Sequence, residues 1–111
     1  MREDRDRLHL LHIRDSTEKV LEYLKDTTFD DFKKREKDYD AILMRMVVIG
    51  EAVNDLTPKF KEKHHDLPWY EAVGLRNRIA HGYINIDPKV VWDTVTNDFP
   101  DLRKKLEEIL K

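Results

Sequence analysis

The chain has 111 residues, of which 40% are charged, and its 21 Lys and Arg against 23 Asp and Glu give a formal net charge of −2. This near balance excludes the strongly basic field of a bulk nucleic-acid binder, so any contact with RNA must be local. The absence of Cys excludes disulfides, thiolate nucleophiles and Cys-based metal sites, and no apolar stretch approaches the roughly 20 residues of a membrane span. We therefore expect one soluble, cytoplasmic domain over residues 1–111.

The first half of the chain predicts two long helices separated by a break. Apolar residues at helical spacing predict a first helix over residues 4–25. The segment TTFDDFKK then interrupts the pattern, with Thr28 or Asp30 available as a helix cap. A second helix over residues 38–56 carries the most apolar run and is expected to be the most buried element. Its Gly50, less favourable than Ala inside a helix by about 1 kcal/mol, indicates close approach of another backbone, within the bundle or across a dimer.

The second half predicts one short helix and two long helical segments. Thr57, followed by Pro, caps a short basic helix in KFKEKHH. The letters DLPW open the next helix, WYEAVGLRNRIAH, which stops at Gly82. Asp87, again followed by Pro, starts the last segment, where Pro100 predicts a kink or a restart. With no convincing strand, the predicted fold class is all-α: an up-and-down bundle of four main helices with one short additional helix.

The stretch RNRIAHGY, at the end of the fourth predicted helix, combines side chains suited to chemistry on a phosphodiester. Arg76 offers a permanently charged, planar set of donors for phosphate oxygens. His81 accepts or gives a proton near neutral pH, and Tyr83 adds a hydroxyl. Because Gly82 is suited to end a helix in the left-handed conformation, we expect His81 and Tyr83 at an exposed helix end.

The spacing of the motif limits how its residues meet. Five positions along a regular helix correspond to about 140° around its axis, so Arg76 and His81 do not share a face. Either the long Arg side chain reaches around, the last turn is distorted, or the site is formed across a dimer. Asn77 and His81 are four positions apart and share a face, so the Asn77 amide is a candidate for fixing the imidazole tautomer. Arg78 is a candidate for a second phosphate contact.

A local positive patch is a further candidate for RNA binding. It would combine Arg76 and Arg78 with Lys59, Lys61 and Lys63 if the third and fourth predicted helices lie side by side.

The other polar and aromatic candidates have simpler structural explanations. His9 and His12 lack nearby convergent carboxylates, so we expect no metal site. Glu51 and Asp55 are expected to hold Arg45 or Arg76 in an ion pair, because no substrate geometry links them to the motif. Both Trp residues are expected to anchor the core rather than to stack on bases.

Four stretches of the sequence resemble, in the same order, the HepT-like toxins of the HEPN superfamily (higher eukaryotes and prokaryotes nucleotide-binding domain). They are IGEAVNDL on the second predicted helix, LPW at the start of the fourth, LRNRIAHGY at its end, and IDPKVVWDTVTNDFPDLRKKLEEIL. The signature of that family is Arg, four residues, His, any residue and Tyr, and it fits Arg76, His81 and Tyr83 without a gap. The first predicted helix agrees with the family in length and pattern only.

The resemblance implies an activity, a partner and a mode of regulation. It implies a homodimeric, metal-independent endoribonuclease without a cofactor, whose two motifs meet at the subunit interface. Arg76 and His81 would be the catalytic residues. It also implies the toxin component of a toxin–antitoxin pair. The cognate antitoxin would be a minimal nucleotidyltransferase that silences the toxin by transferring AMP onto the motif tyrosine, Tyr83.

Metal-free RNA cleavage needs three groups, which favours two chains. A base takes the 2′-hydroxyl proton, a cation stabilises the phosphorane, and an acid protonates the departing 5′-oxygen. His81 is suited to be the base and Arg76 the cation, but one His does not readily carry out both proton transfers. We therefore expect a dimer that presents His81 from each chain to the RNA.

Two functions of other classes also fit the sequence. The first is a non-catalytic helical binding partner of a nucleotidyltransferase, from which RNA cleavage has been lost. The second is a nucleotide-binding accessory subunit, which would bind a free nucleotide tightly and cleave no RNA. The intact set of Arg, His and Tyr favours the ribonuclease.

Overall fold

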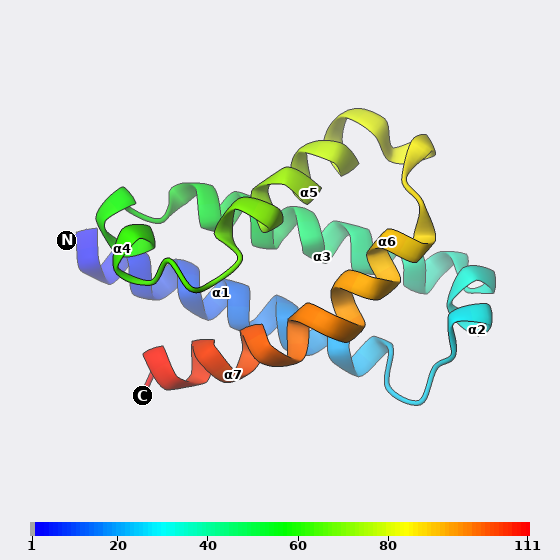
Figure 1. The fold of residues 1–111 in the computed structure, drawn as a ribbon, viewed down its shortest axis with the longest axis horizontal. Helices are drawn as coiled ribbons and strands as arrows, with labels where there is room; N and C mark the ends of the chain where they lie inside the picture. Colours follow the sequence, from blue (N-terminus) through cyan, green and yellow to red (C-terminus); the bar gives the residue numbers. More distant parts are fainter. Residues whose placement is uncertain (1) are drawn as a thin grey trace.

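Helices make up nearly the whole chain (Figure 1). The computed structural model describes residues 2–111, with side chains from residue 5 onward. The long helices are α1 (Arg2–Tyr23), α3 (Glu36–Asp55), α5 (Trp69–Gly82) and α7 (Phe99–Ile109), and the short ones are α2 (Phe29–Lys34), α4 (Pro58–Lys63) and α6 (Pro88–Asp93). The described residues contain no strand, which confirms the predicted all-α bundle of four main helices. No helix among them is long and apolar enough to cross a membrane.

Helix α3 lies at the centre of the bundle, as its apolar sequence predicts. It packs against α1 and against α5, while α7 packs against α1. Helix α5 rests on α3 on the side away from α1 and α7, so one face of α5 is turned outward (Figure 1). This arrangement leaves the motif at the end of α5 on the surface.

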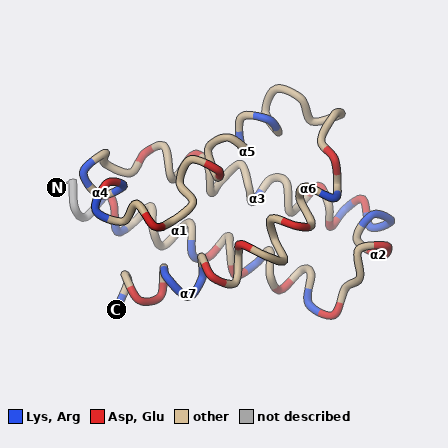
Figure 2. The backbone as a smooth tube through the Cα atoms, viewed as in Figure 1, with Lys and Arg blue, Asp and Glu red and all other residues tan. Residues whose placement is uncertain are grey.

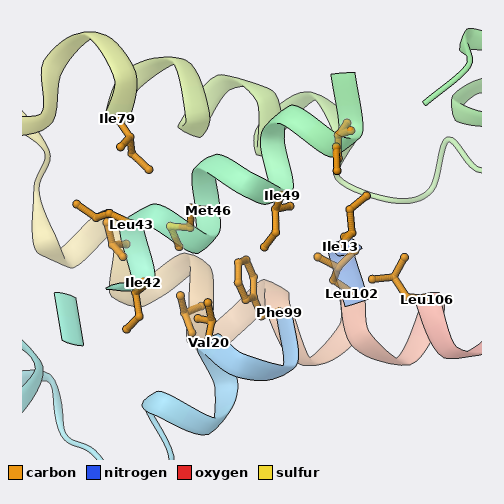
Figure 3. Packing of buried hydrophobic residues seen from close by; sticks show 14 of the residues in the cluster. Ile13, Val20, Ile42, Leu43, Met46, Ile49, Ile79, Phe99, Leu102 and Leu106 are labelled. Carbon is orange, nitrogen blue, oxygen red and sulfur yellow. The ribbon is translucent and has the colours of Figure 1, made fainter. Parts of the chain in front are cut away.

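The core forms where the apolar stripes of three helices meet (Figure 3). Each stripe contains a pair of buried residues seven positions apart, which is about two helical turns and therefore keeps both on one face. These pairs are Ile13 and Val20 in α1, Ile42 and Ile49 in α3, and Phe99 and Leu106 in α7.

Threonine caps start two of the short helices. The Thr28 hydroxyl accepts a hydrogen bond from the Asp31 amide, so the predicted break contains helix α2, which was not expected. Thr57 caps α4 as predicted, by accepting from the Phe60 amide. Thr57 also donates its amide N–H and its hydroxyl to the buried carboxylate of Asp6, at 2.9 and 2.7 Å. These two bonds attach the start of α4 to α1.

The C-terminal segment is one bent helical arm. Helix α6 leads into a π-helical turn, Thr94–Asp98, and then into α7. Pro100 lies in the first turn of α7, where its missing amide N–H is tolerated. The predicted kink or restart at this proline is confirmed, because α7 begins at Phe99, directly after the wider π-helical turn.

Candidate active site

Helix α5 exposes the polar residues of the motif because its apolar residues face inward. Ile79 is buried and Leu75 is half-buried against the core. This orientation leaves Asn77, Arg78 and His81 exposed on the outer side of the last two turns. The expected exposure of the motif His is confirmed.

The end of α5 differs from the predicted geometry. The helix stops at Gly82 as expected, but this residue has φ −152° and ψ 39°, so the predicted left-handed ending is wrong. The chain instead continues turning in the right-handed sense as a 3-10 turn, Tyr83–Asn85. A tighter turn of this kind is a common alternative end for a helix, because its i+3 hydrogen bonds satisfy terminal carbonyls.

Arg76 lies between α5 and α3 with part of its guanidinium at the surface. One terminal nitrogen, Nη2, lies 3.4 Å from Glu51 Oε1, and the other, Nη1, donates to Asn77 Oδ1 at 3.0 Å. The expected ion pair with Glu51 is therefore present. The Nε atom is buried without a hydrogen-bond partner, and the side chain as a whole is 28% exposed. The guanidinium is thus oriented by two protein acceptors and still has free donors.

Gly50 allows this arginine to lie where it does. A Cβ atom added at Gly50 would overlap Cβ of Arg76 and would lie 2.8 Å from its Cγ and 3.0 Å from the Ala72 carbonyl oxygen. The predicted close approach at Gly50 is confirmed, and it occurs within the bundle, between α3 and α5. The absence of a side chain at this position brings the stem of Arg76 onto α3.

His81 lines an open cleft of about 400 Å³ together with Asn77, Arg78 and Asn85. Arg76 does not line this cleft, in agreement with the angle of about 140° that five helical positions produce. The side-chain oxygen of Asn77, Oδ1, accepts a hydrogen bond from Arg76, and no hydrogen bond joins Asn77 to His81. The expected contact that would fix the His81 tautomer is therefore not observed. A single chain therefore brings Asn77, Arg78 and His81 together and places Arg76 toward α3.

Tyr83 reaches back to α3 from the turn after α5. Its hydroxyl donates a hydrogen bond to Oδ1 of Asp40, and its side chain is 49% exposed. This hydrogen bond, with partial burial and the negative charges of Asp40 and Glu36, raises the pKa of Tyr83 above its ordinary value of 10.0. The phenol is therefore accessible and remains protonated at neutral pH.

The basic residues considered for RNA binding do not form a single patch. Lys59, Lys61 and Lys63 belong to α4, which lies near the start of α5 (Figure 2). Arg76 and Arg78 lie about two turns further along α5. Acidic positions lie along the chain between these two groups of basic positions (Figure 2). The local positive charge at the motif comes from α5 itself.

The two Trp residues pack in the core, and the His residues outside the motif belong to no metal site among the described residues. Trp69 is buried and donates its indole N–H to the His64 carbonyl at 2.9 Å, and the Trp92 ring packs against Phe29 and Phe32. Both Trp residues are core anchors, as predicted. Within the part of the chain that the structure describes, no three His, Asp or Glu side chains form a cluster able to hold a metal ion.

Sequence reasoning missed Asp40. It lies 43 residues before Tyr83, within an ordinary helical pattern, and no motif includes it. Only the packing of α3 beside the end of α5 shows that the two side chains meet.

The cleft on this helical domain thus holds an imidazole and one guanidinium, side-chain types suited to proton transfer and to phosphate binding, while a second guanidinium lies partly exposed toward α3. A family model described as Ribonuclease HepT-like matches residues 13–109. The chain belongs to this family of HepT-like ribonucleases.

Relatives at similar length agree with the family assignment. "Putative RNase TTE0752" of Caldanaerobacter subterraneus subsp. tengcongensis is 35% identical over 105 residues, covering 95% of this chain and 94% of that protein. "Probable ribonuclease HepT" of Thermococcus cleftensis is 32% identical over 103 residues, covering 93% and 94%. Their names support ribonuclease activity.

One relative is a longer protein. "Gamma-glutamylcyclotransferase and putative RNase MJ0434" of Methanocaldococcus jannaschii is 39% identical over 105 residues, which cover 95% of this chain but 46% of that protein. The chain thus spans less than half of that relative. No solved structure matches the chain significantly.

Proposed function

We propose that this chain is the toxin of a toxin–antitoxin pair and acts as a metal-independent endoribonuclease. Two copies form the active unit, and Arg76 and His81 of both copies converge on one phosphodiester of the RNA. A cognate minimal nucleotidyltransferase neutralises it by transferring AMP onto Tyr83. The observation that carries this proposal is the exposed imidazole of His81, which shares an open cleft with the Arg78 guanidinium.

The position of Arg76 supports a site shared between two chains. Its guanidinium is held on the α3 side of α5, whereas His81 faces the cleft. A second copy that packs against the outer side of α5 would bring its own motif next to this one. Both arginines and both histidines would then reach the same RNA strand.

Unburied apolar groups around α5 also support a second copy. Tyr70 in the first turn of the helix is 87% exposed, and Ile84 just after the helix is 91% exposed. An apolar groove of about 390 Å³ opens between α5 and the α6–α7 arm, with Phe99, Leu102 and Arg78 among its lining residues. Exposed apolar surface next to a polar site is typical of a surface that another protein covers.

The chemistry requires two proton transfers. His81 of one chain takes the proton of the 2′-hydroxyl as its oxygen attacks the adjacent phosphorus. His81 of the other chain protonates the departing 5′-oxygen. Arg76 neutralises charge on the phosphorane, and Arg78 holds a neighbouring phosphate. Asn77 contributes by orienting Arg76, with which it shares a hydrogen bond.

AMP on Tyr83 would block this site by charge and by bulk. Tyr83 directly follows Gly82, which lines the same cleft as His81. A phosphodiester attached there adds a negative charge that competes with the RNA phosphate for the cationic side chains. The attached nucleoside would also occupy the approach to the cleft.

The test of the catalytic proposal is RNA cleavage by the purified protein in excess chelator. We expect the wild-type protein to cleave RNA under these conditions. His81→Ala should lower the rate by about 10²- to 10⁴-fold, the usual contribution of a general acid or base. Arg76→Ala should lower it by about 10²-fold or more, because charge on the phosphorane loses its main partner.

Two exposed residues away from the motif provide matched controls. His12→Ala on α1 and Arg103→Ala on α7 remove the same side-chain types and should cleave at the wild-type rate. Cleavage that survives in both motif variants would contradict the proposal. Wild-type protein that binds a nucleotidyltransferase but cleaves no RNA would instead support the non-catalytic binding partner.

A further inference from the structure

The hydroxyl of Tyr83 has one defined hydrogen-bond partner, the carboxylate of Asp40. Asp40 lies on the second turn of α3, and Tyr83 follows the end of α5. Packing of these two helices against each other therefore sets the direction in which the phenol points. Because both side chains are exposed, a second protein is able to reach the bonded hydroxyl.

A role in stability does not account for this contact. Exposed polar contacts between side chains contribute little to the free energy of folding. Among the residues that the structure describes, Asp40 takes part in no ion pair, and Glu36 adds a like charge one turn away. By comparison, the Asp6 carboxylate is buried and bonded to the start of α4. Asp40 is thus a free carboxylate whose one defined polar contact is the phenol.

The chemistry of AMP transfer requires a proton acceptor at this hydroxyl. A neutral phenol is a weak nucleophile, and its proton has to leave as the new bond to phosphorus forms. The surroundings of Tyr83 raise its pKa, chiefly through the hydrogen bond to Asp40, so the free phenolate is scarce near neutral pH. Direct attack by a phenolate formed beforehand is therefore disfavoured.

We infer that Asp40 acts as the general base for the modification of Tyr83, an inference that rests on the proposed regulation by AMP transfer. The phenolic oxygen attacks the α-phosphorus of ATP bound to the partner nucleotidyltransferase, and its proton passes to Asp40 Oδ1. The bond between the α-phosphorus and the oxygen bridging to the β-phosphate breaks, and pyrophosphate leaves. Because Asp40 is exposed, it returns the proton to solvent. The toxin thereby supplies a catalytic residue for its own inactivation.

The test measures the initial rate at which the cognate nucleotidyltransferase attaches AMP to purified variants, followed by intact-protein mass. Asp40→Asn keeps an oxygen that accepts the phenol hydrogen bond but does not take up a proton. We expect it to lower the transfer rate by about 10²-fold. Asp38→Asn makes the same change two residues away on α3, where Asp38 lies 3.9 Å from Arg35, and should leave the rate unchanged.

Controls separate this inference from the proposed function. Asp40→Asn and Asp38→Asn should both cleave RNA like the wild type, because neither residue lines the His81 cleft. Tyr83→Phe should accept no AMP and still cleave. If Asp40→Asn accepts AMP at the wild-type rate, Asp40 is not the base. A slow Asp40→Ala would then show only that the hydrogen bond positions the phenol. A wild-type chain that accepts no AMP would overturn the proposed regulation itself.

Discussion

At the scale of single residues, Arg76 shows how the fold orients a guanidinium that the proposed function assigns to phosphate. A guanidinium carries five N–H donors, and Glu51 and Asn77 occupy only part of them. The ion pair with Glu51 is partly exposed and adds at most about 1 kcal/mol to stability. Its main effect is to hold the planar group in one orientation, which lowers the entropy lost when a phosphate binds.

Tyr83 gives a pH-dependent prediction at the same scale. Asp40→Ala should lower the pKa of Tyr83, because it removes the hydrogen bond that is the main cause of the raised value. The pKa is measured by NMR titration of ring-labelled tyrosine, with the signal assigned by Tyr83→Phe. Asp38→Ala is the control and should leave this titration unchanged. An unaltered Tyr83 titration in Asp40→Ala would show that the hydrogen bond is absent in solution.

The raised pKa of Tyr83 also determines how the free energy of unfolding changes with pH. Because the folded chain raises the pKa of Tyr83 above 10.0, its contact with Asp40 stabilises the fold fully below pH 10.0. That contribution is lost as the pH rises through the folded pKa. Urea unfolding should therefore show that the wild-type protein loses more stability than Asp40→Ala as the pH is raised from below 10.0 to above the folded pKa of Tyr83.

At the scale of elements, one glycine of α3 and one glycine in the middle of α5 have opposite surroundings. Gly50 on α3 faces the stem of Arg76, whereas a Cβ at Gly74 on α5 would meet no atom within 4 Å. Gly50→Ala should destabilise the chain by about 1–3 kcal/mol, since α5 must move away from α3. Gly74→Ala should stabilise it by about 1 kcal/mol through helix propensity. Urea unfolding of both variants measures these free energies.

The two glycine variants should also differ in RNA cleavage. A shift of α5 in Gly50→Ala should displace Arg76 and lower RNA cleavage, whereas the monomer fold around Gly74 has no such constraint. Gly74→Ala destabilised to the same extent as Gly50→Ala would contradict the prediction. It would show that another chain fills the space beside Gly74.

At the scale of the whole molecule, the number of chains per active site is the main question. One chain supplies one exposed imidazole in the cleft, together with Arg78, and turns Arg76 toward α3. If each RNA linkage uses His81 from both chains, a mixed dimer with one altered chain is inactive. This requirement distinguishes a shared site from two independent ones.

Mixing experiments measure this requirement. An equal mixture of wild-type and His81→Ala chains that pairs at random contains wild-type dimers as about one quarter of the total, and its cleavage rate should fall to that fraction. Two independent sites would retain about half of the activity. Mixing with His12→Ala chains is the control and should retain all of it. A rate near half in the first mixture would refute the shared site.

Local sequence signals determined most of the fold. Helical spacing placed α1, α3 and α5 within about two residues of their observed starts, because hydrogen bonds and side-chain contacts within a helix join residues three or four positions apart. The cap at Thr57 and the close approach at Gly50 were predicted for the same kind of reason, since each depends on a residue type with a narrow conformational role. Helix α2 was missed because its 6 residues, fewer than two helical turns, are too few to show a periodic pattern.

The motif and the exposure of His81 and Tyr83 were also readable from the sequence, whereas the partners of the motif residues depended on tertiary structure. Arg76, His81 and Tyr83 follow from the spacing of one segment. The contact of Tyr83 with Asp40 and the separation of Arg76 from the His81 cleft follow from how α5 is placed and rotated on α3. That placement is set by the packing of buried apolar side chains against one another. Such packing sums many weak contacts between residues distant in the sequence, so only the folded chain determines which polar groups meet.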